Sequence, residues 1–149
     1  MGTDTAVDGR FVQRIGDRDF VRFEGLLDLA HRQGLQAVET ELIPAPAEVN
    51  GQVAICRAVV TTERGTFSGI GDACRGNVNP RIVPHIIRMS ETRAVARALR
   101  LACNIGMCSV EELGGDVEAP AYHTPGQAPA QAPGGRNGQV HRYRQAAQR

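Results

Sequence analysis

A long stretch without a helix breaker, residues 85–105, constrains the fold of this chain more than any other feature. It reads HIIRMSETRAVARALRLACNI, lacks proline and glycine, and is rich in alanine, which favours a helix by propensity alone. The helix begins either at Asn79, as N-cap to Pro80, or at Pro84, and Gly106 ends it. Counted from Pro84 the helix is about 33 Å long. Its buried face therefore needs a sheet or other helices to pack against.

Three β-rich segments precede this helix. They are QAVETELIPAP, stopped by its two prolines, then residues 53–62 (VAICRAVVTT) and residues 66–73. Tight turns are predicted at Asn50-Gly51 and Arg64-Gly65, so the strands form a three-stranded antiparallel β-β-β meander. Gly69 and Gly71 predict a bend or bulge in the third strand.

A shorter helix is predicted before the meander, at residues 19–33. Phe20, Phe23, Leu26, Leu27 and Ala30 recur at helical spacing, Asp19 is a candidate N-cap, and Gly34 fits a C-terminal glycine cap. Ser109, followed three residues later by Glu112, predicts a capping box and a short helix that ends at Gly114. The order of elements is typical of an α+β domain whose long helix lies on one face of the sheet.

The chain is predicted to divide into a core, residues 1–118, and a tail, residues 119–149. The tail is rich in Pro, Ala, Gly and Gln and has almost no large aliphatic residues, so we expect it to be disordered. Its four arginines make it basic. It is either a solvated linker or an accessory contact for nucleic acid or a repair partner.

The net charge of +1 hides a strong segregation of charge along the chain. Residues 1–63 hold six arginines against ten acidic residues, and residues 64–100 hold seven arginines against two. There is no lysine, and aromatic residues make up only 4% of the chain. This balance excludes a uniformly basic, histone-like protein, and the scarcity of aromatics argues against a base-stacking platform.

Three arginines of the long helix, Arg93, Arg97 and Arg100, fall within an arc of about 60° on the helical wheel. We call them the arginine stripe. Because three positive charges on one face repel each other, the stripe needs acids or anions beside it, and guanidinium binds phosphate bidentately. A phosphate backbone is one candidate partner. The alternatives are an ordinary solvated face, or pairing with Glu39, Glu41 or Glu48 of the sheet or with Glu111 and Glu112 of a neighbouring subunit.

Enzyme, metal, cofactor and membrane classes are not favoured. The chain carries no GxSxG, HExxH, Walker or GxGxxG motif, so we predict no catalytic residue and no cofactor. Its four cysteines form no CxxC pair, so we predict no metal site and reduced thiols. A metal-dependent nuclease is kept as an alternative. No apolar run approaches a membrane span, and the N-terminus lacks the apolar region of a signal peptide, so we expect a cytoplasmic, nucleoid-associated protein.

Three ordered segments carry a resemblance to a known family. VRFEGLLDLAHRQGL, NGQVAICRAVVTTERGTFSGIGDA and MSETRAVARALRLACNIGMCSVEEL resemble the first helix, the strands and the signature helix of the Rad fifty-two superfamily of single-strand annealing proteins. The resemblance covers about residues 10–115. It implies a β-β-β-α core, a homo-oligomeric closed ring and a groove for single-stranded DNA. Its end-protecting members bind 3′ ends, shield them from nucleases, and act in double-strand break repair.

The resemblance also implies which residues bind nucleic acid. Arg97 and Arg100 fall on basic helix positions of the family, Arg64 falls on a basic turn position, and Arg81 and Arg88 align more loosely. Arg93 stands where relatives often carry an acid, and Ala96 where many carry a base, which leaves strand annealing open. We therefore expect a non-catalytic protein that binds single-stranded DNA. The alternative is a self-assembling scaffold that recruits repair partners through its tail.

Overall fold

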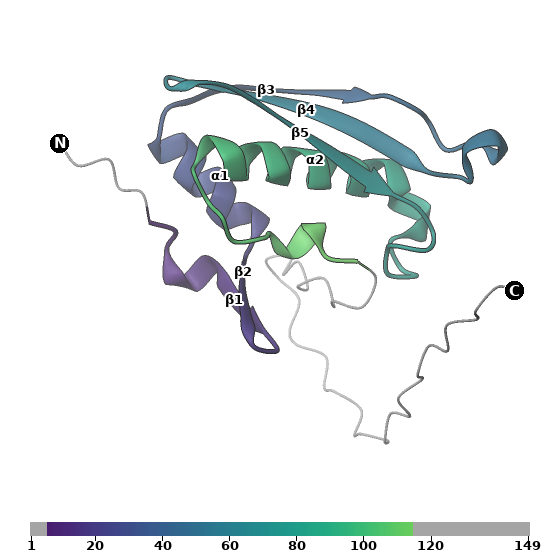
Figure 1. Cartoon of the computed structure of the whole chain (residues 1–149), viewed down its shortest axis with the longest axis horizontal. Helices are drawn as coiled ribbons and strands as arrows, with labels where there is room; N and C mark the ends of the chain where they lie inside the picture. Colours follow the sequence, from purple (N-terminus) through teal and green to yellow (C-terminus); the bar gives the residue numbers. More distant parts are fainter. Residues whose placement is uncertain (1–5, 115–149) are drawn as a thin grey trace, which may run out of the picture. The chain divides into compact units, whose positions relative to one another are not determined.

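The computed structural model describes residues 6–114, which form an α+β fold in three layers (Figure 1). A sheet of three antiparallel strands, β3 (Leu35–Leu42), β4 (Ala54–Thr62) and β5 (Gly65–Ala73), forms the first layer. The long helix α2 (Ile86–Ala102) is the second. Helix α1 (Phe23–Arg32), a hairpin of β1 (Val12–Ile15) and β2 (Arg18–Val21), and the 3-10 turn η4 (Val110–Glu112) form the third. The predicted α+β class, antiparallel meander and two helices are thus confirmed.

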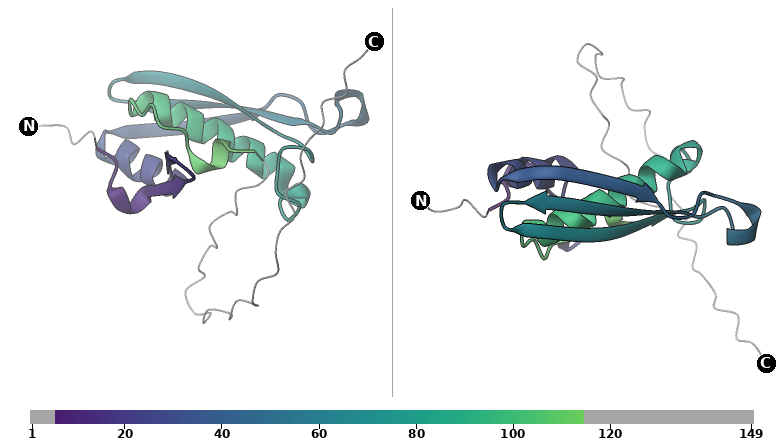
Figure 2. Two further views of the ribbon diagram at one scale, coloured as in Figure 1. Left: turned by 60° about the horizontal axis from the view of Figure 1, so that its bottom comes forward. Right: turned by 90° about the horizontal axis from the view of Figure 1, so that it is seen from above.

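Helix α2 runs beneath the sheet and against β4 and β5 (Figure 2). The hydrophobic core of these elements includes Leu26, Leu29, Ala58, Val60, Ala94, Ala98 and Leu99. Because β3 lies farther from α2, its inward-facing Val38 and Leu42 remain partly exposed. No helix in the described part of the chain is long and apolar enough to cross a membrane.

Gly69 and Gly71 let the helix lie directly on the backbone of β5. A Cβ atom added at Gly69 would stand 2.6 Å from the carbonyl oxygen of Ala94, and one at Gly71 would clash with the backbone of Ala94 and Ser90. The predicted bend or bulge is wrong, because β4 and β5 pair in continuous register from Ala54–Ala73 to Thr62–Gly65. These glycines are required by close packing between helix and strand.

The predicted start of the first helix is also wrong. Asp19 and Phe20 belong to strand β2, which pairs with β1 across a turn at Gly16, a residue with φ +62°. Helix α1 begins at Phe23, whose backbone N–H donates to Oε1 of Glu111 at 3.2 Å. A distant carboxylate therefore supplies the contact that Asp19 was expected to supply. Gly34, at φ +82°, follows the helix as predicted.

The connection between β3 and β4 is longer than the predicted two-residue turn at Asn50-Gly51. The chain leaves the sheet after Leu42, makes the 3-10 turn η2 (Glu48–Asn50), and returns at Ala54. The Asn50 side chain holds this loop, because its Oδ1 accepts the N–H groups of Ala47 and Val53. The second turn is tight, but its central residues are Glu63 and Arg64, one position earlier than predicted.

Helix α2 is shorter than the unbroken stretch suggested. A 3-10 turn, η3 (Val83–His85), contains Pro84 and leads into the helix at Ile86, so the start near Pro84 is the better of the two predictions. The helix ends at Ala102, and Asn104 adopts a left-handed conformation at φ +58° two residues later. Seventeen residues give a length of about 25 Å. The predicted core boundary at residue 118 and the tail 119–149 lie outside the described residues.

Candidate nucleic-acid interface

Arg93 of the arginine stripe is a buried structural residue. Its guanidinium makes five hydrogen bonds, all between 2.7 and 3.1 Å. Four acceptors are backbone carbonyls and the fifth is a side-chain amide oxygen; they belong to Asp72, Asn77 (twice), Glu111 and Leu113. Burial lowers the pKa of Arg93, and the nearby charge of Asp72 opposes this shift. Each nitrogen of Arg93 is thus engaged within the chain, and the residue is buried. That Arg93 binds nucleic acid stays a prediction.

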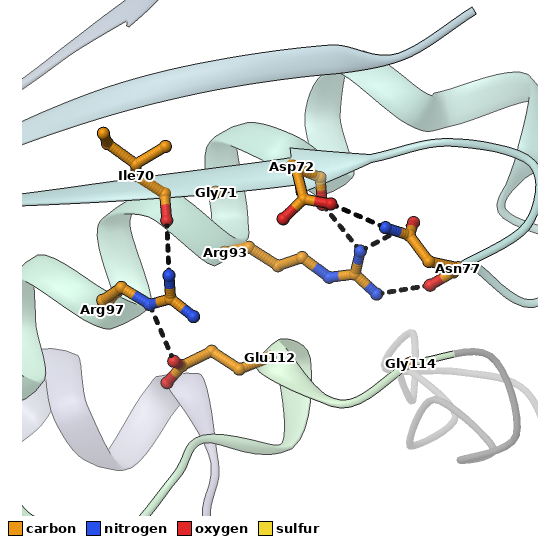
Figure 3. A pocket seen from close by; sticks show the side chains of 8 residues that line it. All are labelled: Ile70, Gly71, Asp72, Asn77, Arg93, Arg97, Glu112 and Gly114. Carbon is orange, nitrogen blue, oxygen red and sulfur yellow. Dashed lines mark hydrogen bonds and ion pairs between the residues drawn. The ribbon is translucent and has the colours of Figure 1, made fainter. Parts of the chain in front are cut away.

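Arg97 and Arg100 share one carboxylate, that of Glu112. Figure 3 shows the Arg97 side of this arrangement. Nε of Arg97 lies 3.2 Å from Oε2, and Nε of Arg100 lies 2.6 Å from Oε1. The pairing acid anticipated from a neighbouring subunit is therefore supplied by the same chain. Arg100 is largely buried, with 17% of its side chain exposed, whereas Arg97 is 51% exposed. Arg97 is the stripe residue that solvent reaches most freely.

Glu112 is itself a buried anion, with 5% of its side chain exposed. Oε1 accepts the backbone N–H and the hydroxyl of Ser109, at 3.2 and 3.0 Å, which confirms the return contact of the predicted capping box. Burial would raise the pKa of Glu112, but the hydrogen bonds from Ser109 and the ion pair with Arg100 outweigh it and hold the pKa below its ordinary value. By contrast, burial raises the pKa of Glu111.

Arg64 lies in the β4–β5 turn and binds the C-terminal end of α2. Nη2 donates to the carbonyl oxygen of Ala102 at 3.2 Å, and Nη1 to Oε1 of Gln33 at 3.4 Å. A cation at this end of a helix offsets the partial negative charge of the last carbonyls. The turn position implied by the resemblance thus carries an arginine with a structural partner, although the residue as a whole is exposed.

Arg81 and Arg88 differ from the stripe, because their side chains make no hydrogen bond or ion pair within residues 6–114. Both are exposed, and so is Arg75, which is equally unpartnered there and which was not among the predicted binding residues. All three lie in residues 74–90, a segment without a single acidic residue. We call it the basic segment. It joins β5 to α2 and includes the first turn of that helix (Figure 1).

The basic segment is held in place by Arg93 and Asn77. The amide nitrogen of Asn77 donates to Asp72 at 2.8 Å, and its amide oxygen accepts the backbone N–H of Cys74 at 2.9 Å. Nη2 of Arg93 donates to the Asn77 carbonyl at 2.7 Å. The buried arginine therefore anchors the start of the basic segment, next to Arg75. The roles of Asp72 and Asn77 in this anchor were not predicted, since only the fold reveals that the loop returns to α2.

The outer face of the sheet has the opposite character. Glu41 pairs across the strands with Arg57, which pairs with Ile70. Glu39 and Asp72 lie on the same face, so three acids there meet a single arginine. In the described part of the chain, uncompensated positive charge is thus found in the basic segment and not on the sheet.

A small pocket of about 90 Å³ lies beside Arg97 at the edge of β5 (Figure 3). Arg93, Arg97, Asp72, Asn77 and Glu112 contribute to its lining, which also includes Ile70, Gly71 and Gly114. Its charges balance, with two arginines and two acids. Within residues 6–114, no three His, Cys, Asp or Glu side chains come together as a metal site would require.

Comparison with known proteins does not place the chain in a family. Neither a family model, nor a curated protein, nor a solved structure matches the chain. The residues and their geometry, together with the resemblance of the three segments described above, are therefore the basis for assigning a function.

Proposed function

We propose that this chain is a non-catalytic protein that binds single-stranded DNA through the basic segment. One observation carries the proposal: Arg75, Arg81 and Arg88 are exposed, lie in a segment (residues 74–90) that contains no acidic residue, and make no side-chain hydrogen bond or ion pair within residues 6–114. Guanidinium groups left unpaired at a surface bind phosphate oxygens well. Arg97, half-exposed and with Nη2 unused within the same residues, extends this surface along α2.

The expected binding is independent of base sequence. Contacts to phosphates carry no sequence information, and the chain has no tryptophan and few other aromatic residues on which bases could stack. The resemblance to single-strand annealing proteins, and within them to DNA damage response protein A, supports the choice of single strands over duplex DNA. We further propose, on that resemblance, protection of 3′ ends from nucleases during double-strand break repair at the nucleoid, and assembly into a closed ring.

Fluorescence anisotropy with a labelled single-stranded oligonucleotide tests the proposal. Replacing Arg81 and Arg88 by glutamine should weaken binding at least tenfold and reduce the slope of log K against log salt by about 1.4, because each phosphate that is no longer neutralised accounts for about 0.7. The matched control replaces Arg18 and Arg57, two exposed arginines outside the basic segment, by glutamine. It should change affinity no more than about twofold, as expected for charge removed from a distant surface.

The outcomes separate the alternatives. Equal weakening by both pairs would show that the basic segment is not the binding surface, and no binding by the parent protein would refute the proposal itself. Incubation with magnesium or manganese should leave the oligonucleotide intact, whereas cleavage would indicate a nuclease. Competition with duplex DNA and with RNA of the same length shows whether single-stranded DNA is preferred.

A further inference from the structure

The arginine stripe already holds an anionic ligand, which is a segment of its own chain. Arg93 binds the carbonyl oxygens of Glu111 and Leu113, and Arg97 and Arg100 bind the carboxylate of Glu112. Arg100 also donates to the carbonyl of Met107 at 3.1 Å. We call residues 107–113 the strap. It folds back along α2 after that helix ends.

The strap is held by two kinds of contact: those of its backbone and buried side chains, and those of the Glu112 carboxylate. Val110 and Ser109 are buried, Val21 donates its N–H to the carbonyl of Cys108 at 3.0 Å, and Arg93 holds two carbonyls on either side of Glu112. None of these contacts uses the Glu112 carboxylate. The backbone of the strap can therefore stay in place when the Glu112 side chain alone moves outward.

The carboxylate of Glu112 has the chemistry of a phosphate in this position. Two guanidinium groups approach this carboxylate. Nε of Arg97 and Nη2 of Arg100 both lie at its Oε2, and Nε of Arg100 lies at its Oε1. Arginine binds carboxylate and phosphate by the same forked geometry. A phosphate oxygen could thus take over these contacts without any change in the backbone of α2.

The site is reachable from solvent on the side of Arg97. Half of the Arg97 side chain is exposed, and its Nη2 makes no hydrogen bond within the described residues. The pocket at the edge of β5 opens beside both Arg97 and Glu112 (Figure 3). An incoming phosphate can therefore contact Arg97 first and reach Arg100 only as the carboxylate withdraws.

We propose that Glu112 is an internal competitor that occupies Arg97 and Arg100 until a phosphate of a bound single strand displaces it. The inference rests on the proposed function, since it concerns how a strand already held by the basic segment is bound at a further point. In the free protein, Glu112 satisfies two arginines that would otherwise lack an anionic partner. In the complex, its side chain turns to solvent and a phosphate takes its place.

A charge-removing variant of Glu112 tests the competition. Glu112→Gln keeps an oxygen that can accept the Ser109 N–H but removes the anion, so it should bind a labelled single-stranded oligonucleotide about three- to tenfold more tightly. Its salt slope should match that of the wild type, because the same phosphate is neutralised in both complexes. Glu48→Gln, an exposed acid of the β3–β4 connection, is the matched control for the change in net charge. Arg97→Gln combined with Glu112→Gln should abolish the increase in affinity.

Each result decides for or against the inference. An increase no larger than that of Glu48→Gln would overturn it while leaving the proposed function intact, provided that the Arg81 and Arg88 variant still weakens binding. Failure of the parent protein to bind would overturn both. Urea unfolding of each variant establishes that it is folded under the conditions of the binding assay.

A second measurement needs no variant. The Ser109 N–H donates to Oε1 of Glu112, and this hydrogen bond breaks if the side chain turns outward. Hydrogen exchange at Ser109 in the wild-type protein should accelerate at least threefold when the oligonucleotide is bound. Unchanged or slower exchange at Ser109, with binding established by anisotropy, would overturn the inference.

Discussion

Nη1 of Arg93 lies 2.8 Å from the carbonyl oxygen of Asp72, and this hydrogen bond ties the end of β5 to the middle of α2. Asp72 is an edge residue of the sheet, and the carbonyl of its edge neighbour Ile70 is bound by Arg97 at 3.2 Å. Two arginines of the helix thus occupy two successive outward carbonyls of the β5 edge. This edge is closed to pairing with another strand at that end, which is a common protection against aggregation.

Loss of Arg93 should destabilise the fold severely. Arg93→Gln removes most of five hydrogen bonds and leaves buried carbonyls without donors, so the free energy of unfolding should fall by more than about 3 kcal/mol. Arg88→Gln, at an exposed and unpaired position, should change it by less than about 0.5 kcal/mol. Urea unfolding followed by circular dichroism measures both. Similar values for the two variants would contradict the structural role of Arg93.

A methyl group at Gly71 should separate the sheet from the helix. Gly71→Ala places its Cβ against the backbone of Ala94 and Ser90, where no side chain can yield, so we expect the free energy of unfolding to fall by about 1–3 kcal/mol or more. Gly76→Ala is the control, because the nearest atom to its Cβ, the Cys74 sulfur, lies 3.9 Å away. Thermal unfolding compares the two, and a stable Gly71→Ala protein would show that β5 and α2 are farther apart.

Lowering the pH should destabilise the folded protein, in part through protonation of Glu112. Because its pKa is lowered in the folded state, its stabilising contribution is fully present above the unfolded pKa of about 4.3 and is lost as the pH falls through the lower folded value. The difference in unfolding free energy between wild type and Glu112→Gln should therefore be constant above about pH 5 and shrink below about pH 4. Urea titrations across this range, from neutral to acidic buffer, give the difference. A difference that grows on acidification would have the wrong sign.

Removing residues 119–149 distinguishes a binding module from a scaffold. If the basic segment binds DNA, the truncated chain should keep the affinity of the full chain within about threefold, allowing for the four arginines removed with the tail. Light scattering with and without an oligonucleotide reports the assembly of both forms. Loss of nearly all DNA binding on truncation would place the binding surface in the tail.

The fold was largely predictable because its elements have strong local signals. The unbroken run of residues 85–105 and the β-branched run of residues 53–62 specify the long helix and the central strand without reference to the rest of the chain. The start of α1 was not predictable in this way. Its first N–H is bound by Glu111, 88 residues away, and no local pattern announces such a contact.

The candidate site, like the fold, could be predicted from the sequence only in part. The helical wheel correctly placed Arg93, Arg97 and Arg100 on neighbouring positions, but it could not show which of them the chain itself would use. That outcome depends on the return of the strap along α2, a tertiary contact. The Ser109–Glu112 box was visible in the sequence as a cap, yet its carboxylate also neutralises two arginines. The prediction that Arg97 and Arg100 contact DNA stays a prediction.

Arg93 binds its neighbours almost entirely through backbone carbonyls, and this has a consequence for variation in the chain. A carbonyl is present whatever the side chain, so Asp72, Glu111 and Leu113 can each be replaced without removing an acceptor from the guanidinium. Asn77 is the exception, because one of its two hydrogen bonds with Arg93 is made by its amide oxygen. The arginine thus keeps its backbone acceptors when the side chains around it change, and the exposed charges of the loop that it anchors can be replaced without loss of these contacts.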